Sequence, residues 1–159
     1  MAQGEEQAMP SIEVGEPREA PTSALQAAEQ QRLSLRRAIA GLEDALAAPG
    51  PWPERLAGPL EQLRDVWAVH VEVTEGPGGL YEEILGQAPR LANRVNRFRR
   101  EHAKLTDGIR NGIADARAGA DAEGLRERMA RLFADLTRHR KRGLDLTYEA
   151  YDVDIGGES

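Results

Sequence analysis

Residues 91–116 read LANRVNRFRREHAKLTDGIRNGIADA, and this stretch decides the fold. Its apolar and small residues recur at alternating spacings of four and three, and His102 falls in the same series. Such alternation places one face of an α-helix against a core. The sequence therefore predicts a long amphipathic helix over about residues 88–118. The series is Leu91, Val95, Phe98, His102, Leu105, Ile109, Gly112 and Ala116.

Three further segments on either side of this stretch have the same period. They cover about residues 22–47, 53–74 and 121–151, and a short helical turn is expected over 80–85. Proline and glycine at 49–51 and 76–79 separate the segments, while Thr22 and Asp121 are suitable N-caps. No segment alternates with a period of two, as a strand would. The prediction is an all-α protein, an antiparallel up-down four-helix bundle formed by residues 22–151.

The two ends of the chain have a different composition. Residues 1–21 contain three prolines, five glutamates and few apolar side chains, which predicts a disordered acidic tail. Residues 152–159 are expected to form a flexible acidic C-terminus. The formal net charge of the whole chain is −6, and five glutamates against Arg18 put −4 of it in the tail. The near-neutral bundle that remains argues against nucleic acid as a partner.

Composition excludes several classes of protein and site. The chain has no cysteine, so disulfides, zinc ribbons and thiol nucleophiles are ruled out. Its apolar runs are far shorter than the roughly 20 residues of a membrane span, and its first ten residues lack the apolar core of a secretion signal. We therefore expect a cytoplasmic protein that does not enter a membrane. Phosphate-binding and hydrolase motifs are missing, which leaves the question of catalysis open but favours a non-enzyme.

The three histidines are the residues that point to chemistry. His70, His102 and His139 each lie on the apolar face of a predicted helix. His102 and His139 are 16 and 18 residues from the loop that joins their helices. At 1.5 Å per residue these separations correspond to about 24 and 27 Å along the helix axes, so the two histidines are expected at the same level of the bundle. His70 is only four residues from the predicted end of its helix, so it joins them only if residues 76–89 shift the register. A metal ion would satisfy three buried imidazoles, as would hydrogen bonds within a core.

The sequence resembles the bacterial hemerythrin-like family over about residues 25–155. The resemblance is carried by residues 70–85 (HVEVTEGPGGLYEEIL), 99–102 (RREH), 136–139 (LTRH) and 148–151 (YEAY), in the same order along the chain. It implies an up-down four-helix bundle whose core holds a non-haem di-iron site that binds oxygen.

The chain departs from the family pattern at several ligand positions. The first helix has no histidine, and Thr74 stands where a carboxylate is expected, one residue before Glu75. On the last helix Gly143 and Leu144 occupy the expected carboxylate positions, and Asp145 follows. Without bridging carboxylates two ferric ions cannot be linked and neutralised. One divalent ion, iron or another metal, could still be held by His70, His102 and His139, with Glu75 or Asp145.

Two functions remain open at this point. The first is a hemerythrin-like binding or sensing module whose metal site is reduced or absent, with loss of the metal slightly favoured. The second is a metal-free helical bundle that associates with a protein partner and uses its histidines for packing. The ligand of the first could be a small molecule, and a homodimer is one of the assemblies left open.

Overall fold

The computed structural model describes residues 22–50, 52–119 and 121–152, and the predicted tails at 1–21 and 153–159 lie outside these ranges. The described chain is helical and contains no strand, which confirms the all-α class. Its elements are α1 (Ser23–Ala47), α2 (Trp52–Glu75), α3 (Leu80–Gln87), the 3-10 helix η1 (Pro89–Leu91), α4 (Ala92–Arg117) and α5 (Ala122–Asp152).

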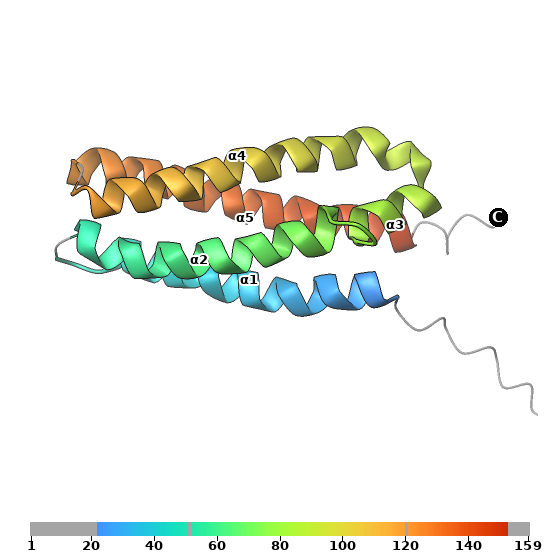
Figure 1. The fold of residues 1–159 in the computed structure, drawn as a ribbon, viewed down its shortest axis with the longest axis horizontal. Coiled ribbons are helices and arrows are strands. Elements are labelled where there is room, and N and C mark those ends of the chain that lie inside the picture. The colour runs from blue at the N-terminus through green and yellow to red at the C-terminus, as the bar shows by residue number, and fades with distance from the viewer. Residues whose placement is uncertain (1–21, 51, 120, 153–159) are drawn as a thin grey trace, which may run out of the picture.

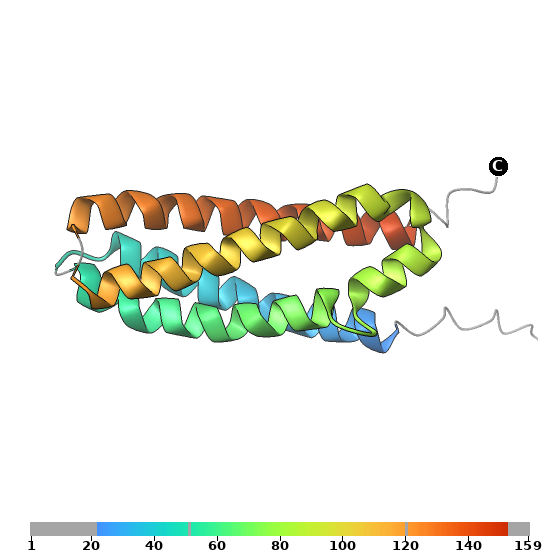
Figure 2. The same cartoon turned by 45° about the horizontal axis from the view of Figure 1, so that its top comes forward.

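Four long helices lie side by side with their axes roughly aligned (Figures 1 and 2). The closely packed pairs are α1 with α2, α2 with α4, α4 with α5, and α5 with α1, so the helices close a ring. The α1–α2 and α4–α5 connections lie at one end, and α3 joins α2 to α4 at the other end (Figure 1). Each helix therefore runs opposite to the neighbour that follows it along the chain.

Predicted caps begin the first and last helices. The Thr22 hydroxyl accepts a hydrogen bond from the Leu25 amide (3.3 Å), and the Asp121 carboxylate accepts from the amides of Glu123 and Gly124. These bonds satisfy amides that have no partner inside a helix. Gly119, with φ +63°, follows the end of α4 in the left-handed region that suits glycine.

The predicted helix over 88–118 was wrong at its beginning. Ala88 lies outside the helical region (φ −134°, ψ 72°) because the ring of Pro89 disfavours helical geometry in the preceding residue. Residues 89–91 then form a 3-10 turn, and the regular helix begins at Ala92. The short helix that was expected over 80–85 continues to Gln87, and α5 includes Asp152.

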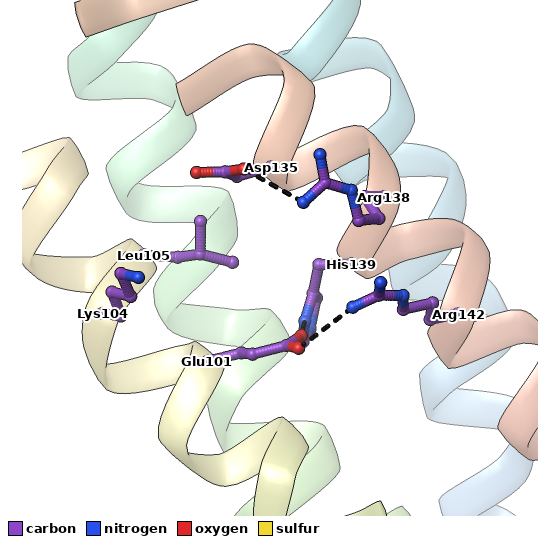
Figure 3. Close-up of a pocket in the computed structure, with 7 residues that line it drawn as sticks. All are labelled: Glu101, Lys104, Leu105, Asp135, Arg138, His139 and Arg142. Carbon is purple, nitrogen blue, oxygen red and sulfur yellow. Dashed lines mark hydrogen bonds and ion pairs between the residues drawn. The ribbon is translucent and has the colours of Figure 1, made fainter. Parts of the chain in front are cut away.

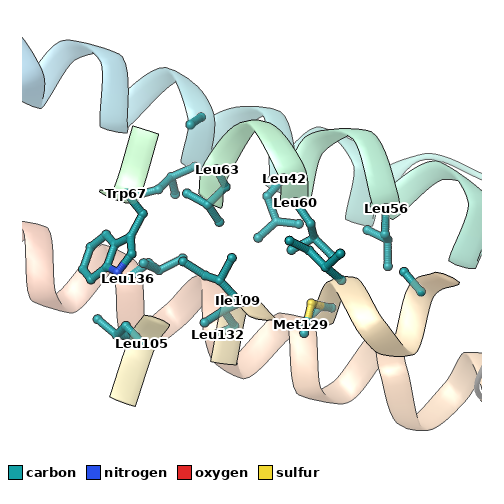
Figure 4. Close-up of a cluster of buried hydrophobic side chains, with 14 of the residues drawn as sticks. Leu42, Leu56, Leu60, Leu63, Trp67, Leu105, Ile109, Met129, Leu132 and Leu136 are labelled. Carbon is teal, nitrogen blue, oxygen red and sulfur yellow. The ribbon is translucent and has the colours of Figure 1, made fainter. Parts of the chain in front are cut away.

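Two apolar clusters fill the interior. The larger one lies toward the α1–α2 loop and is built from all four long helices; Figure 4 labels ten of its side chains. The smaller one gathers residues of α1, α3, α4 and α5, among them Ile84, Val95 and Leu146. Truncating a buried leucine of such a core costs about 2–5 kcal/mol. None of the described helices combines the length and apolar composition needed to cross a membrane.

Candidate metal centre

The three histidines meet between the two apolar clusters. His70 comes from α2, His102 from α4 and His139 from α5, and one ring nitrogen of each lies within 4.8 Å of those of the other two. The Nε2 atoms of His102 and His139 are 3.0 Å apart. His102 and His139 are almost fully buried, while His70 is partly buried. In the described part of the chain these three form the one group of His, Cys, Asp or Glu side chains close enough to share a metal ion.

The crossover between α2 and α4 brings His70 to this level. His70 is five residues from the end of α2, whereas His102 is ten residues into α4. Helix α3 and η1 take up the difference, because they carry the chain across the end of the bundle before α4 begins (Figure 2). Residues 76–89 therefore shift the register of α4 against α2, which is what His70 needed to reach the level of the other two histidines.

Gln31 of α1 orients the ring of His70. Its side-chain nitrogen donates to the backbone carbonyl of Val66 (3.1 Å), which leaves the amide oxygen 2.9 Å from His70 Nδ1. An amide oxygen only accepts, so Nδ1 of His70 carries the proton and donates it. The other ring nitrogen, Nε2, is buried and has no hydrogen-bond partner among the residues that the structure describes.

Glu101 of α4 orients the ring of His139. One of its carboxylate oxygens lies 2.8 Å from His139 Nδ1, and the other is 3.5 Å from the guanidinium of Arg142 (Figure 3). The carboxylate accepts from Nδ1, so Nε2 of His139 again lacks a proton. A pocket of about 120 Å³ between α4 and α5 reaches His139 at this point, with Lys104 and Arg138 among its lining residues.

His102 also has a carboxylate at its Nδ1 atom, although the hydrogen bond is longer than that of His139. Its Nδ1 lies 3.3 Å from Glu75 Oε2. The hydroxyl of Tyr81, on α3, is 3.2 Å from His102 Nε2, and the two rings are stacked with centroids 5.6 Å apart. Burial raises the pKa of Tyr81, so the phenol keeps its proton and donates it to His102 Nε2.

The interior holds these imidazoles in their neutral form. Burial is the main cause that lowers the pKa of all three, to about 3 for His70 and about 2 for His102. Repulsion from His139 adds to the effect at both, and for His139 the bond to Glu101 acts in the opposite direction. Neutral imidazole is the form that binds metal ions.

Trp67 forms a wall of the site. Its ring stacks on His70 with centroids 4.9 Å apart and meets His102 and His139 edge-on at 5.4 Å. Its indole nitrogen donates to the hydroxyl of Thr106 (2.9 Å). Side chains that pack this closely restrict how far the imidazoles can turn.

The two carboxylates that the sequence offered as ligands have other positions. Glu75 contacts the Nδ1 side of His102 and so lies behind the ring, away from the point where the Nε2 atoms meet. Asp145 is exposed and does not belong to the group of potential ligands. The histidines alone make up that group.

Three residues that surround the histidines were not predicted from the sequence: Gln31, Glu101 and Tyr81. For Gln31 a signal existed, because the apolar series of α1 passes from Ala28 to Leu35 and Gln31 fills the gap as a buried polar residue. Nothing comparable marks Glu101, whose partner is on another helix, or Tyr81, whose place depends on how α3 crosses the bundle.

Compared with known proteins, the chain matches no family model, no curated protein and no solved structure.

Proposed function

We propose that the chain binds one divalent first-row metal ion through the Nε2 atoms of His70, His102 and His139. Three imidazole ligands leave a fourth position for water or a small ligand, as in catalytic zinc sites. The protein would then be a binding or sensing module, related to the hemerythrin-like bundles but with a single-metal site.

The unpaired Nε2 of His70 is the observation that carries the proposal. Hydrogen bonds at Nδ1 place the proton of each ring on its outer nitrogen, so three lone pairs converge on one point. Tyr81 donates one hydrogen bond, to His102 Nε2, whereas no described residue supplies one to His70 Nε2. The Nε2 atoms of His102 and His139 are 3.0 Å apart. With both protons on Nδ1, neither Nε2 atom has a hydrogen to donate to the other, and a cation between them would stabilise the pair.

A metal ion is a better candidate for this cation than a proton. Protonating one ring would put a charge into an interior that already lowers the pKa of all three histidines. A metal ion would instead be bound by all three lone pairs at once. Nitrogens within 4.8 Å of one another lie at most roughly 2.8 Å from a common centre, so movements under about 1 Å would reach Zn–N distances of about 2.1 Å.

The partners behind the rings also favour this proposal. Metal-bound histidines commonly donate their second N–H to a carboxylate or a carbonyl oxygen, which fixes the ring and makes it a stronger ligand. Gln31, Glu75 and Glu101 supply such oxygens to the three rings.

One ion fits the ligand set better than two. A di-iron centre needs carboxylates that bridge and neutralise the ions, and the group of potential ligands in the described chain consists of imidazoles alone. A cavity of about 30 Å³ borders His70, Tyr81 and His139. It is large enough for an atom or two beside the ion, which suits a small ligand at the fourth position.

The metal content of untagged protein tests the proposal. We expect about one equivalent of zinc, iron or another divalent metal per chain, and at least a tenfold weaker affinity in His102→Ala and His139→Ala. Asp145→Asn is the matched control, since an exposed carboxylate outside the cluster should not affect binding. Less than about a tenth of an equivalent after incubation with metal would overturn the proposal, as would metal content that survives the loss of both histidines.

A metal-free interaction bundle is the second candidate. It is favoured by two large apolar side chains, Leu33 of α1 and Val69 of α2, which are 51% and 52% exposed. A partner protein that covered these side chains would bury apolar surface, which favours association. Failure to bind metal would leave this candidate in place.

A further inference from the structure

A groove of about 530 Å³ runs between α2 and α4, on the outer side of Trp67. Its apolar wall is formed by Trp67 and Val71 of α2 and by Ile109 and Ile113 of α4. Trp67 separates the groove from the histidines, since its ring contacts all three of them. The groove is therefore a second site, distinct from the metal centre.

Every charged side chain that lines this groove is an arginine. Arg64 comes from α2, and Arg110 and Arg117 come from α4. Their acidic partners are Asp65, Asp107 and Glu61, none of which lines the groove. Exposed ion pairs of this kind contribute only about 0–1 kcal/mol, so an anion in the groove could compete for the guanidinium groups.

The positive charge of the α2–α4 groove is concentrated toward one end of the groove. The bond from Trp67 to Thr106 and the pair of Glu61 with Arg117 fix how the antiparallel helices are aligned. In this alignment the arginines lie on the side of the α1–α2 loop, and Val71 and Trp67 lie on the side of the histidines. Lining residues 106–117 of α4 cover about 16 Å along the helix at 1.5 Å per residue.

A second groove in the same molecule provides a comparison. It lies between α1 and α2, has a volume of about 510 Å³, and is lined by Val66, Val69 and Val73. Its charged lining residue is Asp65. The two grooves are thus similar in size and apolar character but opposite in charge.

We infer that the α2–α4 groove binds a long-chain monocarboxylate, with the carboxylate among Arg64, Arg110 and Arg117 and the alkyl chain over Trp67 and Val71. Guanidinium groups pair well with carboxylates, and the apolar wall of the groove would contact the alkyl chain of the ligand. The volume of about 530 Å³ lies within the range of small-molecule sites.

Tryptophan fluorescence can follow this binding. The chain has two tryptophans, and Trp52→Phe leaves Trp67 as the only one. Dodecanoate, titrated into the Trp52→Phe protein below its micelle concentration, should change the emission in a saturable way. Its methyl ester has the same chain without the charge and should bind about tenfold more weakly or worse.

Two exposed alanines of α4 give a matched pair of variants. Ala114 lines the groove and Ala103 does not. Ala114→Glu places a carboxylate among the arginines and should weaken dodecanoate binding about tenfold or more, while Ala103→Glu should leave it within about twofold. Arg64→Gln is a milder second variant, with the same direction expected, in case Ala114→Glu disturbs the fold.

Three results would overturn the inference. The first is the absence of any saturable change with dodecanoate. The second is equal affinity for the acid and its methyl ester, which would mean apolar adsorption without use of the arginines. The third is equal binding by Ala103→Glu and by correctly folded Ala114→Glu or Arg64→Gln. None of these results bears on metal binding, which is measured separately.

Discussion

A single glutamine illustrates how this site works at the scale of residues. Gln31 is fixed by its bond to the carbonyl of Val66, and it then fixes which nitrogen of His70 carries the proton. The chemistry offered by His70 is therefore decided by a residue that has no place in the ligand set. Glu101 does the same for His139.

Replacing Gln31 with leucine should weaken both metal binding and stability. The Nδ1–H of His70 would lose its acceptor, which costs about 1–3 kcal/mol when the group stays buried, and metal affinity should fall about 10–100-fold. Calorimetric zinc titration and urea unfolding measure the two effects. Gln30→Leu, on an exposed neighbour, is the control, and an equal effect of the two variants would contradict the role of Gln31.

Acid should destabilise the metal-free protein before carboxylates titrate. The pKa of His70 is about 3 in the folded protein, below the ordinary value of 6.5. Unfolding then takes up a proton below pH 6.5, so stability is full above that pH and falls as pH drops toward 3. At pH 5 the loss from His70 alone is about 2 kcal/mol.

Urea unfolding at pH 7.5 and pH 5 checks this dependence. The His70→Gln variant, which has nothing to titrate at this position, should lose less stability between the two pH values than the parent protein. Parallel losses in both proteins would show that His70 does not carry the effect.

At the scale of elements, the short helix α3 is the part that assembles the site. It carries the chain across the end of the bundle, which sets the level of His70 against His102, and it brings Tyr81 to His102 Nε2. Its seating depends on a tight turn, in which the Gly78 amide donates to Glu82 (2.7 Å) and the Gly79 amide to the carbonyl of Gly76 (2.9 Å).

The turn before α3 should not tolerate a side chain at Gly79. A Cβ there would lie 2.8 Å from the Gly76 carbonyl oxygen and 2.9 Å from that of Thr74, both of them backbone atoms. We expect Gly79→Ala to cost about 1–3 kcal/mol. Gly86→Ala, inside α3 with nothing within 4 Å of its Cβ, should be neutral or stabilise by up to about 1 kcal/mol. The denaturant midpoints of the two variants, compared with that of the parent protein, measure both changes in stability.

At the scale of the whole molecule, the polar layer of histidines lies between two apolar clusters. The larger cluster contributes most of the buried leucines and lies on the side of the α1–α2 loop. We therefore expect substitutions deep in the larger cluster, away from Trp67, to lower stability without removing the histidine site.

Zinc should raise the melting temperature of the protein if the ion binds the folded state alone. At a free concentration of 100 Kd the gain is about 2.7 kcal/mol. Leu60→Ala should lower the melting temperature of the metal-free protein, since a fully buried leucine is lost, but keep the shift caused by zinc. His102→Ala should lose that shift. Thermal unfolding with and without zinc tests this, and a shift that persists in His102→Ala would contradict the assignment.

The sequence by itself determined the class of fold, the four long helices and the placement of three histidines on buried faces. It could do so because helical period and end signals are local, so each segment shows which of its faces is buried. It also predicted the common level of His102 and His139, since a short loop joins their helices. The start of α4 was missed because Pro89 acts on the residue before it.

Only the tertiary structure decided how the histidines are used. The level of His70 depends on the path of α3, and the proton positions depend on Gln31, Glu75 and Glu101, of which Gln31 and Glu101 had not been singled out from the sequence. The groove between α2 and α4 also exists only when the two helices are aligned side by side. Such features arise from atoms far apart in the chain, and their positions are set by packing and register, which no local pattern records.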